Sequence, residues 1–102
     1  MILFGDINKG LKECHATQGA VLVDVREKTE YAFGHIAGAV NEPLSTIHKT
    51  TLPKNVPLFL YCLRGSRSRK AAGVFRKMGY EKVKSIGGIN GYKGELVRYK
   101  QI

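Results

Sequence analysis

The sequence predicts an α/β fold, an open sheet of four or five mostly parallel strands with helices on both faces. Apolar runs rich in β-branched and aromatic residues, at 20–25 and 58–62, alternate with segments whose apolar residues recur at helical spacing. This alternation is typical of parallel sheets with crossover helices. The 20–25 run lacks polar alternation, which indicates a strand covered on both faces. A chain of 102 residues can bury one core, so we expect a single domain over residues 1–102.

The composition is ordinary for a globular protein except for its positive charge. The 17 Lys and Arg against 8 Asp and Glu give a formal net charge of +9, which attracts anions. These basic residues are dispersed and do not alternate with aromatic residues, so we do not expect a nucleic-acid partner. No apolar run approaches a membrane span, and the N-terminus lacks a signal-peptide pattern. We therefore expect a cytoplasmic location, and two cysteines fit such a reduced compartment. We also expect a monomer.

The first helix is predicted over residues 7–17, after an apolar start at 1–4 that could be an edge strand. Asp6 suits the N-cap position. The apolar positions at helical spacing are Ile7, Leu11 and Cys14. Cys14 therefore falls on the buried stripe, where packing is a more common role for a free cysteine than a reaction with Cys62.

A short helix is predicted over residues 27–33, and we expect Gly34 to close it in the left-handed conformation. Charged side chains surround the turn that leads into this helix. We interpret Asp24, Arg26 and Glu30 as an ion-pair set that fixes the turn.

Residues 39–41 predict a short strand, which Pro43 ends before a short helix at 45–48. The chain has three histidines, His15, His35 and His48. None has metal-ligand spacing with either cysteine, so we expect no metal site. His35, next to the predicted strand, is interpreted as a hydrogen-bonded structural residue.

Cys62 ends an apolar run and is followed at once by a loop rich in Gly, Ser and Arg, and then by a helix predicted over 68–78. The apolar stripe of this helix is Ala71, Ala72, Phe75 and Met78. Ligands bind beyond the carboxyl ends of parallel strands, which is where Cys62 falls. The helix N-terminus and the arginines favour the nucleophilic thiolate, and Gly65 lets backbone N–H groups turn inward around an anion. We therefore interpret Cys62 as a nucleophile rather than a core residue.

The end of the chain predicts one more strand and one more helix. Residues 83–86 read as a short strand, and Gly87 and Gly88 turn the chain near the cysteine loop. The apolar residues expected to dock a final helix on the sheet are Tyr92, Leu96 and Tyr99.

Four segments resemble motifs of the rhodanese-like family, in the same order and at similar spacing. These segments are Asp24-Val25-Arg26, Gly34-His35-Ile36-Ala37-Gly38-Ala39-Val40-Asn41, Cys62-Leu63-Arg64-Gly65-Ser66-Arg67 and Gly87-Gly88-Ile89-Asn90-Gly91-Tyr92. The resemblance covers nearly the whole chain. It implies the rhodanese-like open sheet and a structural role near the site for Asp24, Arg26 and His35.

The resemblance also implies sulfur transfer. The Cys62 thiolate would take a sulfane sulfur from thiosulfate or a related anionic donor, hold it as a persulfide without a further cofactor, and pass it to cyanide, a thiol or a partner protein. Arg64 and Arg67 would orient the donor, and backbone N–H groups would cradle the persulfide. The residues expected to bind substrate are Leu63, Arg64, Gly65, Ser66, Arg67 and Ser68.

Two alternatives stay open at this point. The first is a sulfur carrier or protein-binding module that keeps the same cysteine but does not turn over alone. The second is a phosphatase or arsenate reductase, whose common Cys-x5-Arg loop surrounds a tetrahedral anion. Here Arg67 comes one residue early for that loop, and Ser68 occupies the sixth position after Cys62.

Overall fold

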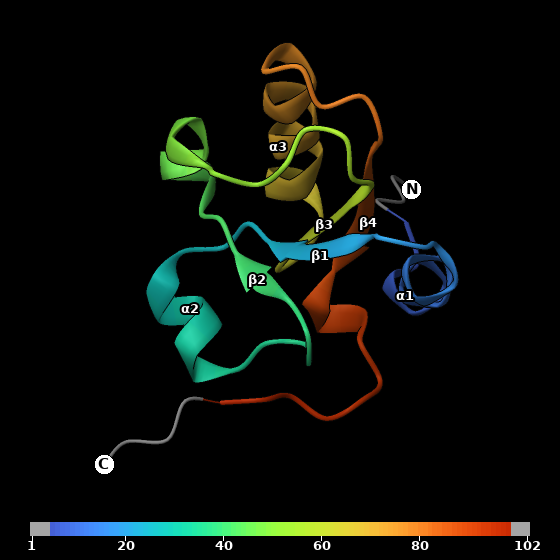
Figure 1. Ribbon diagram of the computed structural model, residues 1–102. Helices are drawn as coiled ribbons and strands as arrows, with labels where there is room; N and C mark the ends of the chain where they lie inside the picture. The colour runs from blue at the N-terminus through green and yellow to red at the C-terminus, as the bar shows by residue number, and fades with distance from the viewer. Residues whose placement is uncertain (1–4, 99–102) are drawn as a thin grey trace.

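The computed structural model describes residues 5–98. The strands form one parallel sheet with helices on both faces (Figure 1). The sheet order is β2-β1-β3-β4. The strands are β1 Val21–Asp24, β2 Val40–Asn41, β3 Leu58–Cys62 and β4 Val83–Gly88. The α-helices are α1 Ile7–Ala16, α2 Lys28–Phe33 and α3 Ser66–Lys77, and the 3-10 helices are η1 Leu44–Lys49 and η2 Ile89–Gly91. The predicted fold class is confirmed.

Two apolar layers hold the helices on the sheet. One layer packs α1 and α2 against one face, and the other packs α3 and η1 against the opposite face (Figure 1). All five residues of β3 are buried, because this strand has neighbours on both sides and helices above and below. The carboxyl ends of β1 and β3 pair side by side, with Asp24 opposite Tyr61, and so bring Cys62 next to the turn after β1.

The first helix forms as the sequence predicts. The Asp6 carboxylate accepts a hydrogen bond from the Asn8 N–H at 3.0 Å, which caps the helix. Ile7, Leu11 and Cys14 are all buried. Burial raises the pKa of the Cys14 thiol, which is the expected state of a packing cysteine.

Helix α3 begins at Ser66, two residues earlier than predicted. Gly65 has φ 109° and lies directly before the helix, so this glycine alone completes the turn from the strand. Ser66 and Arg67 therefore belong to the first turn of α3 rather than to the loop.

Two expectations are wrong, one about the conformation of Gly34 and the other about a helix at the end of the chain. Gly34 is extended, with φ 166° and ψ 127°, and not left-handed. The predicted final helix is absent from the described residues up to Arg98. After η2 the chain is irregular, and Val97 instead forms an isolated bridge with His35 through two backbone hydrogen bonds of 2.9 and 2.8 Å. A Cβ at Gly34 would lie 3.0 Å from Leu96 Cδ1, so glycine lets this segment pack closely.

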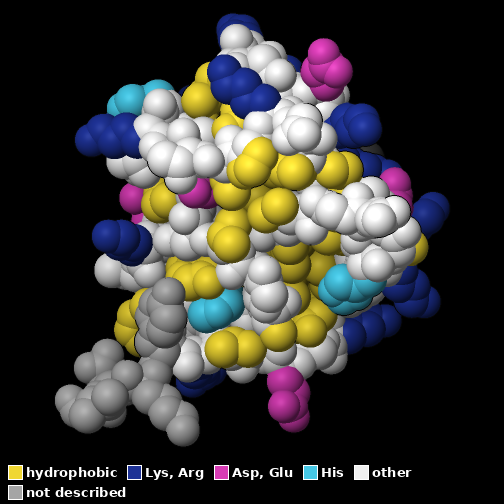
Figure 2. Space-filling view, viewed as in Figure 1, with side chains coloured by type: hydrophobic (Ala, Val, Ile, Leu, Met, Phe, Trp, Pro, Cys, Tyr) yellow, Lys and Arg dark blue, Asp and Glu magenta, His cyan; other side chains and the backbone are white. Residues whose placement is uncertain are grey.

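Some expectations fall outside residues 5–98, namely the edge strand at 1–4 and the docking of Tyr99. Within the described residues, no helix is both long and apolar enough to cross a membrane. The same residues hold no group of three or more His, Cys, Asp or Glu side chains that could bind a metal ion. Figure 2 shows one face of the molecule with apolar side chains at its centre and Lys and Arg side chains around the periphery. The positive charge on this face is dispersed and does not form a stripe.

Candidate active site

Cys62 lies at the end of β3, directly below the N-terminus of α3. Its side chain is buried, with 1% of the residue exposed. The Gly65 N–H donates a hydrogen bond to Cys62 Sγ at 2.9 Å. Only Leu63, Arg64 and Gly65 separate the strand from the helix. The sulfur therefore receives a backbone donor and the positive end of a helix dipole from one short loop, which favours a negative charge on the sulfur.

Two hydroxyl groups, that of the buried Ser68 and that of the partly buried Ser85, lie beneath this loop. Ser68 is fully buried, and its Oγ is 3.7 Å from Cys62 Sγ. Ser68 Oγ also donates to Gly65 O at 3.0 Å and is 2.7 Å from Ser85 Oγ. Ser68, which we expected to bind substrate, therefore supports the sulfur and the loop from below and is closed to solvent.

The end of β4 holds the loop from the other side. Gly88 pairs with Cys62 in the sheet, and the Asn90 N–H donates to Leu63 O at 3.1 Å. A Cβ built at Gly88 would clash with Leu63 O and would lie 2.5 Å from Arg64 Cα. Gly87 and Gly88 lie near the loop as predicted, but they are the last residues of β4 rather than a turn after a strand at 83–86, because Gly88 still pairs with Cys62. The steric need for glycine at position 88 is a finding of the structure, and the paired glycines were its signal in the sequence.

Arg67 makes a two-pronged ion pair with Glu30 of α2. Arg67 Nη1 donates to Oε1 at 2.7 Å, and Nη2 donates to Oε2 at 2.9 Å. The Arg67 hydrogen bond is the main cause that lowers the pKa of the Glu30 carboxyl. The same hydrogen bond raises the pKa of the Arg67 guanidinium, and the charge of Cys62 adds to that rise. The sequence interpretation grouped Glu30 with the Asp24–Arg26 pair, but its hydrogen-bonded ion-pair partner is Arg67.

The Asp24–Arg26 pair fixes the turn after β1, as expected. Arg26 donates to both Asp24 carboxylate oxygens, with the shortest distance 2.7 Å, and also to Gly34 O at 2.7 Å. Burial lowers the pKa of the Arg26 guanidinium, but the hydrogen bond and charge of Asp24 outweigh it and raise that pKa. The Arg26 guanidinium lies 5.9 Å from the centre of the Tyr61 ring. This turn packs against the residue that precedes Cys62.

His35 and Tyr61 stabilise the segment after α2. His35 is buried, its Nδ1 is 2.8 Å from Tyr31 O, and its ring stacks on Tyr31 at 3.7 Å. The expected hydrogen bond of His35 is present, and its structural role near the site stays a prediction. The Tyr61 hydroxyl accepts a hydrogen bond from the Ile36 N–H at 3.1 Å, and burial raises the pKa of this phenol. The sequence interpretation did not single out Tyr61.

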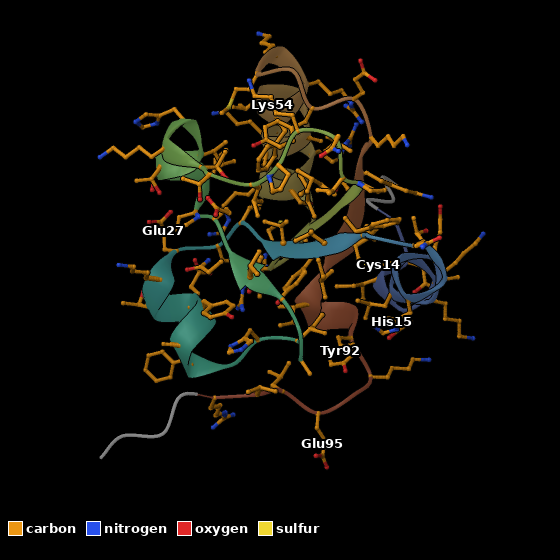
Figure 3. The ribbon with its side chains drawn as sticks, in the orientation of Figure 1. Cys14, His15, Glu27, Lys54, Tyr92 and Glu95 are labelled. Carbon is orange, nitrogen blue, oxygen red and sulfur yellow. The ribbon has the colours of Figure 1, made fainter. Side chains whose placement is uncertain are left out.

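The predicted substrate-binding residues lie in three environments. Leu63, Arg64 and Ser66 are exposed, Arg67 is half-buried, and Gly65 and Ser68 are buried. Their contact with a substrate stays a prediction. Cys14 does not join them, because it lines a small hollow with Ala20, at the opposite end of β1. Figure 3 shows Cys14 on α1 at the right of the view and Glu27, at the start of α2, at the left.

Comparisons with known proteins identify the family. The rhodanese-like domain family matches residues 7–95. The uncharacterized protein YqhL of Bacillus subtilis is 39% identical over 80 residues, which cover 76% of this chain and 64% of that protein. The thiosulfate sulfurtransferase PspE of Escherichia coli is 35% identical over 71 residues, covering 66% of this chain and 68% of PspE.

A solved structure described as a rhodanese with anions from E. coli superposes with a TM-score of 0.68 at 30% identity. The superposition covers 78% of this chain and 99% of that chain. The chain spans less than two thirds of the length of the first curated relatives that it matches, 64% for YqhL. The match over residues 7–95, the four-stranded parallel sheet and the cysteine loop agree with one another. The chain belongs to the rhodanese-like domain family.

Proposed function

We propose that this chain is a sulfurtransferase that carries sulfur on Cys62. The thiolate attacks the outer sulfur of thiosulfate or a related donor, the S–S bond of the donor breaks, and its electron pair leaves with sulfite. Cys62 then holds the transferred sulfur as a persulfide. A thiophilic acceptor, such as cyanide, a thiol or a partner protein, attacks the terminal sulfur and releases the Cys62 thiolate. The cycle needs no further cofactor.

The hydrogen bond from Gly65 N–H to Cys62 Sγ carries this proposal. A donor at 2.9 Å, aimed from a helix N-terminus, stabilises an anionic sulfur without a bound metal or a general base. The family membership and the similarity to a thiosulfate sulfurtransferase support the same chemistry. Both cysteines are free, which supports our further proposal that the protein works in a reducing compartment such as the cytoplasm.

The loop geometry favours sulfur transfer over phosphate or arsenate chemistry. A loop that surrounds a tetrahedral anion needs several inward donors and an arginine free to hold the oxygens. Here three residues separate Cys62 from α3, and Arg67 is bound to Glu30 on two oxygens. We expect negligible hydrolysis of an aryl phosphate.

Intact-mass measurement after incubation with thiosulfate tests the proposal. We expect the protein to gain one sulfur atom that a reductant removes. Cys62→Ser should abolish this gain, whereas Cys14→Ser, the matched control, should leave it nearly unchanged. Loss of most sulfur loading in the Cys14 variant would contradict the single-cysteine mechanism.

The same protein distinguishes the alternatives. Release of thiocyanate from cyanide supports an enzyme that turns over alone, whereas loading without release supports a sulfur carrier that needs a dedicated partner. Phosphatase activity in the unmodified protein that disappears in Cys62→Ser would overturn the sulfurtransferase proposal.

A further inference from the structure

The ion pair between Arg67 and Glu30 brings two opposite charges to the cysteine loop. Arg67 lies in the first turn of α3, five residues after Cys62, and Glu30 reaches it from α2. Both side chains are about one third exposed, 34% for Arg67 and 32% for Glu30. An anion that approaches the loop therefore meets both charges through partly aqueous surroundings.

The pair lies within electrostatic range of the reactive sulfur. The hydrogen bond with Glu30 is the largest influence on the Arg67 guanidinium, and the charges of Cys62 and Asp24 also act on it. Because both guanidinium nitrogens that face Glu30 are occupied, Arg67 presents much less positive charge to an incoming anion than a free arginine would. Arg64, the arginine within the loop itself, is exposed.

We propose that Glu30 is a specificity-determining residue of the Cys62 site, because its carboxylate neutralises Arg67 and weakens the attraction of multiply charged anionic donors. This inference rests on the proposed sulfur transfer for the identity of the donor. Glu30 sets the charge at the loop, and Arg67 acts mainly through this pair rather than by direct contact with the donor. The site should accordingly favour donors of low charge over dianions such as thiosulfate.

The size of the effect follows from the charge that is removed. For partly exposed charges close to the sulfur, one unit charge changes the local concentration of a monoanion by about fivefold. The interaction energy doubles for a dianion, so the corresponding factor is the square, about 25-fold. Salt should reduce both factors, because the pair is not fully buried.

Alkylation by two reagents measures this charge without any sulfur transfer. Iodoacetate is a monoanion and iodoacetamide is neutral, so the ratio of their reaction rates at Cys62 reports the attraction of an anion. A change in the reactivity of the thiolate alters both rates alike and leaves the ratio unchanged. We would use the Cys14→Ser background, in which Cys62 is the only thiol. Glu30→Gln should raise the iodoacetate to iodoacetamide ratio about fivefold, and Arg67→Gln should lower it.

Two features make the Glu30→Gln variant a clean test. Gln at position 30 can still accept the Glu27 N–H hydrogen bond, 3.1 Å in the structure, so the cap of α2 is retained. The matched control is Glu13→Gln, which breaks a 2.7 Å ion pair with Lys84 on α1 and β4. That control should leave the rate ratio unchanged. A merely structural role for Glu30 would change both reagent rates alike.

The double variant Glu30→Gln/Arg67→Gln decides between charge and contact. If the pair acts as a unit, replacing two opposite charges by two neutral groups restores the ratio to within about twofold of the parent. If the double variant has the same rate ratio as Arg67→Gln, Arg67 contacts the anion directly and the proposal is overturned. An unchanged rate ratio in Glu30→Gln would also overturn it.

Thiosulfate kinetics connect the charge effect to sulfur transfer. The KM for thiosulfate should fall in Glu30→Gln, by up to about 25-fold at low salt, with kcat little changed. If no variant loads sulfur but the alkylation ratios change as expected, the proposed function fails and the role of Glu30 in anion selection stands. Normal sulfur loading with unchanged alkylation ratios rejects the role of Glu30 and leaves the proposed sulfur transfer standing.

Discussion

Adding one methyl group at Gly88 should disable the cysteine loop while the fold survives. Gly88 has φ −125° and ψ 143°, a backbone conformation that any residue adopts, so only the space is limiting. The new Cβ would lie 2.5 Å from Arg64 Cα and 2.7 Å from the carbonyl carbon of Leu63, whereas ordinary contacts are 3.4 Å or longer. Backbone atoms cannot turn aside as a side chain can, so the whole loop must shift.

The required shift is about 1 Å, and a misplacement of this size costs on the order of 100-fold in rate. We therefore expect Gly88→Ala to slow sulfur loading of Cys62 by thiosulfate about 100-fold. Forcing an extra methyl group into a packed region should lower the free energy of unfolding by about 1–3 kcal/mol. Quenched time points read by intact mass give the loading rate, and urea unfolding gives the stability.

Two glycine variants separate the loop shift from a general loss of stability. Gly10→Ala would press a Cβ against the Ile86 side chain, 2.6 Å from its Cγ2, away from the loop. It should destabilise the fold comparably but leave the loading rate within a few-fold of the parent. Gly73→Ala in α3 meets no atom within 4 Å and should stabilise the protein by about 0.5–1 kcal/mol. A Gly88→Ala protein that loads sulfur at the normal rate would refute the steric argument.

Three further outcomes concern charged and titrating groups. Asp24→Asn leaves Arg26 buried without its carboxylate and should lower the free energy of unfolding by about 3–5 kcal/mol in urea titrations. Burial raises the folded-state pKa of Cys14, so the free energy of unfolding should fall as pH rises above the ordinary thiol pKa of 9.0. The fall should be smaller in Cys14→Ser. Equal losses of stability in the parent and in Cys14→Ser between pH 8 and pH 10 would contradict this. Arg67 lowers the folded-state pKa of the Glu30 carboxyl. The stability that this carboxylate provides should therefore be present above the ordinary carboxyl pKa of 4.5 and disappear as pH falls through the lowered pKa. A Glu30→Gln protein with the same acid unfolding as the parent would reject this expectation.

The sequence predicts the elements that have a strong local signal. The apolar run at β3 and the stripe of α3 identify a strand, a loop and a helix, and therefore the position of Cys62, because buried faces have regular periods. The predicted start of α3 is two residues too late, because Gly65 completes the turn by itself and no capping side chain marks the boundary.

The errors occur where distant segments decide the structure. Glu30 and Arg67 are 37 positions apart, and their pairing depends on how α2 and α3 meet at the carboxyl edge of the sheet. The spacing of Tyr92 and Leu96 suggested a helix, but backbone hydrogen bonds between His35 and Val97 hold this segment extended. Helical spacing over so short a segment is a weak signal, and tertiary contacts outweigh it.

The burial of Cys62 gives the protein an internal reporter of its own stability. The sulfur lies where β3, β4 and α3 pack together, and these elements make some of the most extensive contacts in the described chain. Local fraying at a chain end or a surface turn does not open such a region to a bulky reagent, which reaches the sulfur only when the whole molecule unfolds, whereas small donors and small alkylating reagents react with it in the folded state. A maleimide too large to pass the loop should therefore react with Cys62 no faster than the amide protons of β3 exchange with deuterium. The two slow rates, measured on one sample, would both track the free energy of global unfolding.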